Sequence, residues 1–279
     1  MGLTIERAAV DGIPKPLAHY TPVARAGDFV FAAGQIASDY RTGVAPEARV
    51  DPAFPYYGSD IKCQARYILQ NLQKTFAAAG TSFDHVVKAQ VFLADLNCFS
   101  AFDEVWREFF PTPPPRTTVG TTGLLVPGCL VEVDLIAALP GASAQHISVP
   151  NIPQPMAHYT PVTRVGDLVF AAGQIASDYR TGIPPEARVD PAFPYYGSDI
   201  KHQARYILQN LQNTFAAAGT SLDHVVKAQV FLTDLHQFFA FDEVWRQFFP
   251  TPPPRTTVGT TGLLVPGCLV EIDLIAVMP

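Results

Sequence analysis

"DIKCQARYILQNLQKTFAAAG", residues 60–80, is the stretch that decides the fold. Its apolar residues recur every three or four positions, the spacing that places them along one face of an α-helix. Ser59 is a suitable N-cap, the helix dipole favours Asp60 in the first turn, and Gly80 is a suitable C-cap. The stretch therefore predicts an amphipathic helix with one buried face. That face consists of Ile61, Ala65, Ile68, Leu69, Leu72 and Phe76.

Strands and a second helix are predicted on either side of this helix. "HVVKAQVFLAD" (85–95) is rich in β-favouring residues, and "CLVEVDLIAAL" (129–139) alternates as a strand does. The order β-β-α-β-α-β-β predicts an α+β domain in which two helices cover one face of a mixed sheet. The other face of the sheet is left bare, so we expect self-association. The remaining expected elements are strands at 4–10, 27–37 and 116–122 and a helix at 99–110.

The chain repeats itself after 139 residues. "AAGQIASDYRTG" at 32–43 returns at 171–182, and Pro140 corresponds to Pro279. A period this long indicates two whole domains rather than a solenoid. We expect a first domain at 1–140, a linker at 141–150 that passes into the first strand of the next domain, and a second domain at 151–279.

Composition excludes several classes of function. The net charge of −6 provides no basic field for nucleic acid, and no apolar run reaches the length of a membrane span. The four cysteines show no CxxC spacing. The chain also lacks the common nucleotide-binding, metal-binding and nucleophile motifs. The sequence predicts a cytoplasmic protein with reduced cysteines and either a cofactor-free, metal-free reaction or no reaction.

In each copy one arginine has only apolar and hydroxyl-bearing residues as its near neighbours in the sequence. Arg116 follows the prolines of "PTPPPRTTVGTTGLLVPGCLVE" (111–132), and Arg255 occupies the same place in the repeat. A buried guanidinium needs an anion, and a ligand carboxylate is a natural bidentate partner. The alternative is a structural ion pair to an acid of the chain, such as Asp103, Asp134 or Glu132.

Two acids alternate on the last strand of each copy. Asp134 and Asp273 lie two residues after Glu132 and Glu271, so each pair shares one face of its strand. An acid of such a pair that points into a pocket can act as a general acid or base with a raised pKa. The alternative is an acid pair on a solvated sheet face.

Aromatic residues give weaker signals. Tyr20 and Tyr159, each in "AHYTP", either line a pocket or simply pack. Trp106 lies three residues after Asp103 on one helix face, where core packing is the simpler reading. The loop "DPAFPYYGSD" (51–60) forms either a pocket lid or an ordered surface segment.

Several segments in the right order resemble one family. "FAAGQIA" (31–37), "QARYILQNLQKTFAAAGTSFDHVVKAQVFLADL" (64–96) and "PPPRTTVGTTGLLVPGCLVEVDLIA" (113–137) are similar to signature segments of the RidA, YjgF or L-PSP family. Its members are small proteins that deaminate reactive enamines and imines. The resemblance covers both copies nearly end to end, so the chain is interpreted as a tandem duplication.

The resemblance implies a chorismate-mutase-like α+β fold, barrel-like trimers, and active sites in clefts between neighbouring domains. In the implied mechanism an arginine holds the substrate carboxylate while the enamine is protonated at carbon. Water then adds to the imine carbon, and ammonia and a keto acid leave without any cofactor. The implied catalytic residues are Arg116, Arg255, Asp134 and Asp273, and the implied substrate-binding residues are Tyr20, Tyr159, Gly34, Gly173, Thr118, Thr257, Asp103, Asp242, Trp106 and Trp245.

Several departures from the family pattern predict a remodelled pocket. Aspartate replaces the family's usual glutamate at 134 and 273, threonine stands for cysteine at 118 and 257, and aspartate stands for asparagine at 103 and 242. The loop at 38–58 is also longer than usual. The first expectation is therefore a deaminase-like hydrolase of a small or mid-sized carboxylate. The alternatives are tautomerisation, ring opening or C–C or C–N chemistry on a bulkier acid, and a non-catalytic ligand-binding or chaperone-like protein.

We expect a homo-oligomer of three chains, whose six domains fill two stacked trimeric rings. The alternative is that both domains of a chain share one ring. Neither nucleic acid nor a membrane is an expected partner.

Overall fold

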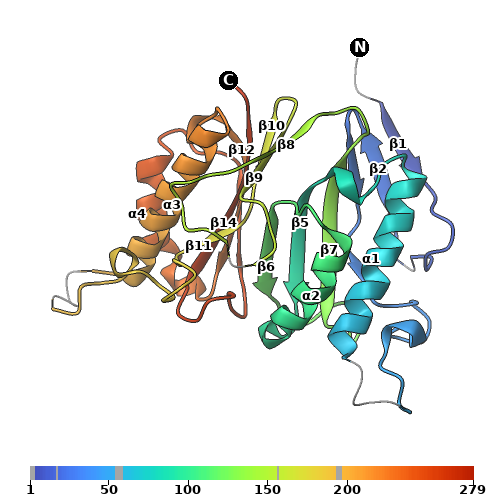
Figure 1. Cartoon of the computed structure of the whole chain (residues 1–279). Helices are drawn as coiled ribbons and strands as arrows, with labels where there is room; N and C mark the ends of the chain where they lie inside the picture. The colour runs from blue at the N-terminus through green and yellow to red at the C-terminus, as the bar shows by residue number, and fades with distance from the viewer. Residues whose placement is uncertain (1–3, 17, 54–58, 156, 193–196) are drawn as a thin grey trace. The chain divides into compact units, whose positions relative to one another are not determined.

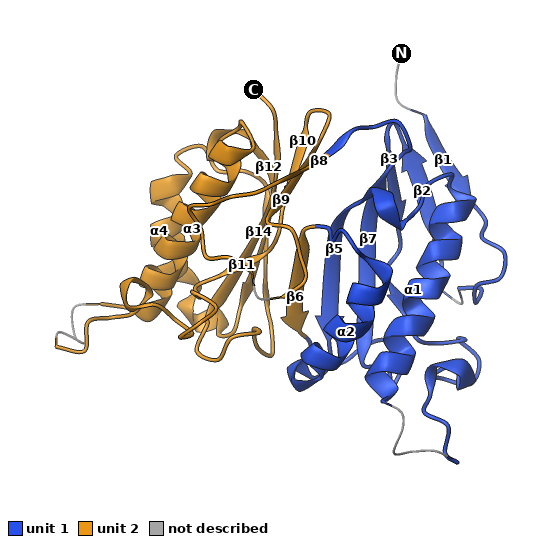
Figure 2. Cartoon of the chain, viewed as in Figure 1, with its two compact units in different colours: residues 1–114, 121–144 blue, residues 115–120, 145–279 orange. Residues whose placement is uncertain are grey.

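The computed structural model of the chain describes residues 4–16, 18–53, 59–155, 157–192 and 197–279. These residues form two compact units, which Figure 2 distinguishes by colour. Unit 1 comprises residues 1–114 and 121–144, and unit 2 comprises residues 115–120 and 145–279. The short segment 115–120 from the first sequence copy is therefore grouped with the second.

The first copy folds in the order β-β-β-β-α-β-α-β-β (Figure 1). The order matches the prediction apart from the division of its early strands. The elements are β1 (Ile5–Ala8), β2 (Val23–Ala26), β3 (Phe29–Ala32), β4 (Gln35–Ile36), α1 (Asp60–Ala78), β5 (Val86–Leu93), α2 (Phe99–Phe109), β6 (Arg116–Gly120) and β7 (Val131–Ala138).

The second copy repeats this order. Its elements are β8 (Ala144–Ile147), β9 (Val162–Val165), β10 (Leu168–Ala171), β11 (Gln174–Ile175), α3 (Asp199–Ala217), β12 (Val225–Leu232), α4 (Phe238–Phe248), β13 (Arg255–Gly259) and β14 (Val270–Val277). Strand β8 lies inside the segment that the sequence indicated as a linker passing into the first strand of the next domain.

Two seven-stranded sheets form the frame. Their strand orders are β1-β2-β3-β7-β5-β6, with β4 beside β7, and β13-β12-β14-β10-β9-β8, with β11 beside β14. In the second sheet β12 is antiparallel to β14, which places Gln229 opposite Asp273. It is parallel to β13, which places Ala228 opposite Arg255. The sheet is therefore mixed, as predicted.

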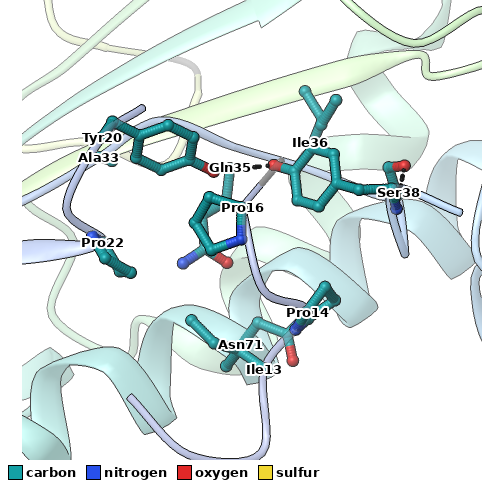
Figure 3. Close-up of a pocket in the computed structure, with 11 residues that line it drawn as sticks. Ile13, Pro14, Pro16, Tyr20, Pro22, Ala33, Gln35, Ile36, Ser38 and Asn71 are labelled. Atoms are coloured by element: carbon teal, nitrogen blue, oxygen red, sulfur yellow. Dashed lines mark hydrogen bonds between the residues drawn. The ribbon is translucent and has the colours of Figure 1, made fainter. Parts of the chain in front are cut away.

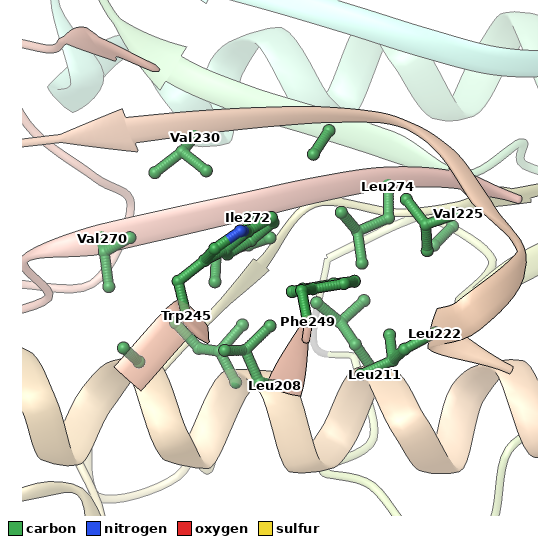
Figure 4. Close-up of a cluster of buried hydrophobic side chains, with 14 of the residues drawn as sticks. Leu208, Leu211, Leu222, Val225, Val230, Trp245, Phe249, Val270, Ile272 and Leu274 are labelled. Carbon is green, nitrogen blue, oxygen red and sulfur yellow. The ribbon is translucent and has the colours of Figure 1, made fainter. Parts of the chain in front are cut away.

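The helices cover one face of each sheet, which confirms the two-layer α+β expectation (Figure 1). In unit 1, α1 buries the predicted face, and Leu72 and Phe76 are fully inaccessible. Ser59 is the N-cap residue but makes no side-chain cap bond, whereas Asp60 accepts a hydrogen bond from the amide of Val50. In unit 2, Trp245 and Phe249 stack with ring centroids 4.1 Å apart within the equivalent core (Figure 4).

The early strands are the main local difference from the prediction. The expected strand at 27–37 is divided into β3 and β4, and an unpredicted strand, β2, pairs with β3 as a hairpin. Gly27 makes the turn with a φ of 57°, a left-handed conformation that glycine adopts without steric cost. Strand β2 has the sequence "VARA", too short and too poor in β-branched residues to stand out.

In the part of the chain that the structure describes, no helix combines the length and the apolar character that crossing a membrane requires.

Candidate active site

At Gly173, between β10 and β11, two side chains of unit 2 approach the backbone closely. A Cβ atom there would collide with the carboxylate of Glu271 and would lie 2.7 Å from the hydroxyl of Thr117. Only a residue without a side chain allows these two groups to approach the backbone so closely. The predicted site glycine is therefore explained by packing against an acid and a hydroxyl.

Asp273 lies beside this point on β14. Its Oδ2 accepts a 2.6 Å hydrogen bond from Oγ1 of Thr117, and both side chains are buried. Glu271 is buried on the same strand face, two residues earlier. The expected alternation of acids is thus present, and both acids lie in a covered position rather than on a solvated face. The threonine that contacts the acid is Thr117, while the predicted Thr118 is buried next to it on β6.

Arg116 and Tyr159 complete this arrangement. Arg116 is only 4% exposed. Burial raises the pKa of the Tyr159 hydroxyl to about 12, and the negative charge of Glu271 adds to this shift, while the positive charge of Arg116 opposes it. Both charges therefore act on the same phenol. Unit 2 thus combines an arginine from the first copy with the tyrosine, glycine and acids of the second.

A pair of tyrosines borders the site in each copy. Tyr159 donates a 3.0 Å hydrogen bond to the hydroxyl oxygen of Tyr179, and the hydroxyls of Tyr20 and Tyr40 are hydrogen-bonded at 3.1 Å. Burial, followed by the hydrogen bond with Tyr20 and the charge of that residue, raises the pKa of Tyr40 above its usual range. Each pair lines a hollow, one of about 320 Å³ that includes open solvent in unit 1 (Figure 3) and a similar one in unit 2.

Arg255 at the start of β13 has an acid partner. Its Nη2 donates a 2.8 Å hydrogen bond to Oδ1 of Asp242, whose Oδ2 accepts a second bond from Arg246. Burial alone would raise the pKa of Asp242, but the hydrogen bonds and charges of the two arginines lower it. The guanidinium also stacks on aromatic rings, with Cζ 4.8 Å from the centroid of Trp245.

One nitrogen of Arg255 remains without a partner. Among the residues that the structure describes, its buried Nη1 has no hydrogen-bond acceptor. A buried donor that is left unpaired is unfavourable by about 1–3 kcal/mol, so a ligand acceptor or a partner group is expected there. The arginine therefore combines features of both readings that the sequence left open, a structural ion pair and an available donor.

The acids of the first copy lie in a less covered position. Glu132 and Asp134 on β7 are half-buried, whereas their counterparts in unit 2 are buried. Burial raises the pKa of Asp134 to about 6, with a smaller contribution from the charge of Glu132. Burial also raises the pKa of Glu132. A carboxylic acid that titrates near neutral pH is suited to exchanging protons with a substrate.

The other predicted residues of the first copy have varied surroundings. A Cβ at Gly34 would collide with the Glu132 carboxylate, so the close approach seen at Gly173 is repeated. Tyr20 is 40% exposed. Asp103 is ion-paired with Arg107, and Trp106 is fully buried with its ring 4.2 Å from that of Phe110. Thr257 is half-buried on β13.

Some site residues were not predicted from the sequence. The carboxylates that lie against the two glycines belong to Glu132 and Glu271, which were not among the predicted site residues. Thr117 and Tyr179 were also missed. The sequence signal that could have found the glutamates is the two-residue period of a strand, which places Glu271 and Asp273 on the same face. Nothing in the sequence says which of the two acids contacts the glycine.

Half of the predicted lid at 51–60 falls outside the described residues, since 54–58 and, in the second copy, 193–196 are not described. Within the described parts of the chain, no group of three or more His, Cys, Asp or Glu side chains is arranged to hold a metal ion.

Comparisons with known proteins place the chain in a family. The model of the family described as Endoribonuclease L-PSP matches residues 12–139 and 149–278. A RutC family protein of Pyrococcus horikoshii is 34% identical over 127 residues, which are 46% of this chain and 92% of that protein. The 2-iminobutanoate/2-iminopropanoate deaminase of Dermatophagoides farinae is 32% identical over 133 residues, 47% of this chain and 94% of that protein.

Solved structures give matches of the same extent. The crystal structure of E. coli TdcF with bound serine is 31% identical and covers 48% of this chain and 99% of its own, with a TM-score of 0.41. Each of these relatives spans about half of the chain. The double match of the family model over most of the chain shows that it belongs to the Endoribonuclease L-PSP family, also called RidA or YjgF, and carries the family domain twice in tandem.

Proposed function

We propose that the chain is a cofactor-independent deaminase of carboxylate-bearing enamines and imines. The observation that carries the proposal is the meeting of Arg116, Tyr159 and the two buried acids of β14 in unit 2. One cation and two acids around a glycine provide an anchor for a carboxylate and groups for proton transfer. The relative named 2-iminobutanoate/2-iminopropanoate deaminase supports this class of substrate.

The proposed reaction needs only orientation and proton movement. Arg116 holds the substrate carboxylate, and an acid group delivers a proton to the β-carbon of the enamine, which becomes an iminium. Water, oriented by Asp273 or Glu271, adds to the iminium carbon to give a carbinolamine. Transfer of a proton to its nitrogen expels ammonia and leaves a keto acid. The protein contributes proximity and general acid–base catalysis, which suffice for a reactive substrate.

A second candidate is a ligand-binding protein without turnover. The buried Nη1 of Arg255 supports it, because this donor has no acceptor among the described residues and can bind an acid whether or not a reaction follows. A protein of this kind would bind small acids without releasing ammonia. A third possibility is a reaction on a bulkier acid without net deamination. Turnover of such an acid without release of ammonia would distinguish it from the proposed deamination.

Self-association is part of the proposal. β6 and β13 share the sequence "RTTVG", yet every residue of β6 is buried while Thr256 and Val258 on β13 are exposed. In unit 2, β6 lies on the face that carries Asp273 and Gly173. We expect β13 of a second chain to bring Arg255 and Thr256 to the equivalent face of unit 1, in a homo-oligomer of three chains. Sedimentation equilibrium tests this, and a stable monomer at micromolar concentration would contradict it.

Ammonia release from enamines generated in situ tests the reaction. Because the two arginines occupy equivalent places, we expect Arg116→Ala and Arg255→Ala each to remove part of the turnover and the double variant to abolish it. Arg246→Ala is the matched control, since Arg246 also binds Asp242 but is 79% exposed. Full turnover in the double variant would refute the carboxylate anchor, and tight binding of small acids without any turnover would favour the second candidate.

A further inference from the structure

Tyr40 and Tyr179 have an unusual backbone conformation. Among the described residues they are the two non-glycine residues with positive φ, at 58° and 59°. A left-handed conformation is unfavourable for a residue with a side chain, and it persists only where the surroundings enforce it. The same strained tyrosine is present in both copies, which raises the question of what the phenol contributes.

A dense network of hydrogen bonds holds the turn. The hydroxyl of Ser38 donates to the carbonyl of Gly43 and accepts from the amide of Tyr40. Asp39 accepts from the amides of Arg41 and Thr42 and from the Thr42 hydroxyl. These bonds, led by that from the Thr42 hydroxyl, lower the pKa of Asp39 to about 2, so the turn keeps its charge at neutral pH.

The second copy contains the same network. The hydroxyl of Ser177 donates to the carbonyl of Gly182 and accepts from the amide of Tyr179. The carboxylate of Asp178 accepts from the amides of Arg180 and Thr181. The backbone at each tyrosine is thus fixed from both sides. A turn this constrained aims the phenol in one direction.

In unit 2 the phenol of Tyr179 contacts the hydroxyl of Tyr159, and the charge of Glu271 acts on it. Tyr179 accepts the hydroxyl proton of Tyr159, and the charge of Glu271 contributes to raising the pKa of both phenols, for which burial is the larger cause. Both hydroxyls therefore stay protonated at neutral pH. Removing the Tyr179 oxygen would leave the Tyr159 hydroxyl without this acceptor while keeping both rings.

The tyrosine pair also walls a hollow. In unit 1 the hollow is lined by both tyrosines, by Gln35 and Asn71, and by apolar residues that include Ile13 and Pro14 (Figure 3). The hydroxyl bond links two of its sides, one from the segment before β2 and one from the turn after β4. An aromatic ring held at its hydroxyl must break this hydrogen bond before it can swing aside to admit a larger group.

We propose that Tyr40 and Tyr179 are positioning residues that hold Tyr20 and Tyr159 against the hollow and thereby restrict the site to acids with short side chains. The inference rests on the proposed function, because it assigns a role to tyrosines of that same site. The role also gives a reason for the strained turn. Its left-handed backbone directs the phenol toward the site tyrosine, although tyrosine disfavours this conformation.

The test is the double variant Tyr40→Phe and Tyr179→Phe. Calorimetry compares the binding of 2-oxobutanoate, a short keto acid, with that of phenylpyruvate, a bulky one. A lost hydrogen bond of about 1 kcal/mol corresponds to about a fivefold change in an equilibrium constant. We expect the Kd ratio of phenylpyruvate to 2-oxobutanoate to fall about fivefold and, with enamine substrates, KM for a short acid to rise while kcat is retained.

Thr81→Val with Thr220→Val is the matched control. Each of these threonines donates a 2.6 Å hydrogen bond to a carbonyl, buried at Thr81 and partly buried at Thr220, and neither residue lines a hollow. The control should lower stability without changing the Kd ratio. A ratio in the phenylalanine variant within about twofold of the wild type would overturn the proposal. Because binding is read without turnover, absence of ammonia release from the wild type would refute deamination while leaving this test intact.

Tyr40→Gly with Tyr179→Gly separates the turn from the phenol. Glycine adopts the left-handed conformation without strain, so the turn is retained while the phenol is lost. We expect the same fall in the Kd ratio as in the phenylalanine variant. An unchanged ratio here would also overturn the proposal.

Discussion

Thr117 on β6 donates a 2.6 Å hydrogen bond to Asp273 on β14, and both side chains are buried. The two residues lie in different copies of the repeat, 156 positions apart. The equivalent threonine of the second copy, Thr256, is exposed on β13. Identical sequence thus has two different surroundings, and this asymmetry gives the first prediction.

Thr117→Val should destabilise the protein at every protein concentration. The substitution keeps the shape of the side chain but leaves a buried carboxylate oxygen without this donor, at a cost of about 1–3 kcal/mol. Urea denaturation measures the change. Thr256→Val should leave the urea midpoint nearly unchanged in dilute protein and instead raise the concentration at which the oligomer dissociates. Equal loss of stability from both variants in dilute protein would contradict this account.

Gly173→Ala should be more damaging than Gly34→Ala. At 173 the new methyl group would meet both Glu271 and Thr117, whereas at 34 its three nearest atoms all belong to the Glu132 side chain, whose carboxylate end can rotate away. Overpacking of this kind costs about 1–3 kcal/mol. Gly123→Ala is the control, because among the described residues, apart from its two chain neighbours, no atom lies within 4 Å of the place that its new methyl group would take. Urea midpoints should rank Gly123→Ala above Gly34→Ala above Gly173→Ala, and any other order would refute the packing argument.

Asp134 should make stability depend on pH between about 4 and 6. Burial, helped by the charge of Glu132, raises its folded-state pKa to about 6, above the unfolded value of about 3.9. The folded state therefore binds more protons in this window, so the free energy of unfolding falls as pH rises through it. Asp134→Asn removes this titration and should flatten the decline. Urea midpoints from pH 4 to 7 measure it, and identical pH profiles for variant and wild type would count against the shift.

The sequence predicted features that depend on residues close together in the chain better than contacts between residues far apart in it. The spacing of Leu72 and Phe76 indicated α1 correctly because helix periodicity is local. Gly80 was expected at the C-cap, but Ala79 takes that position and Gly80 follows with a φ of 81°, an error of one residue. The signal was sound because glycine is favoured where the helix ends in a left-handed residue.

The site was less predictable, since its contacts join distant segments. Nothing local in "RTTVG" says that Thr117 meets Asp273, or that the acid against Gly173 is Glu271. The acid partner of Arg255 was also uncertain, because Asp242 lies 13 residues earlier on a helix and the contact depends on how α4 packs against β13. Tyr40 and Tyr179 were missed because a positive φ at tyrosine contradicts its own preference.

Asp242→Asn should strengthen the binding of carboxylates at Arg255. The substitution keeps a hydrogen-bond acceptor for Nη2 but removes the negative charge that neutralises the guanidinium. If this charge weakens ligand binding by about 1 kcal/mol, the affinity for 2-oxobutanoate at that site should rise about fivefold. The neutral amide of the same ligand should show no such gain. Arg246→Gln, which leaves the Arg255–Asp242 pair in place, should change neither affinity. Unaltered carboxylate affinity in Asp242→Asn would mean that the pair is structural and that the anchor for the substrate lies elsewhere.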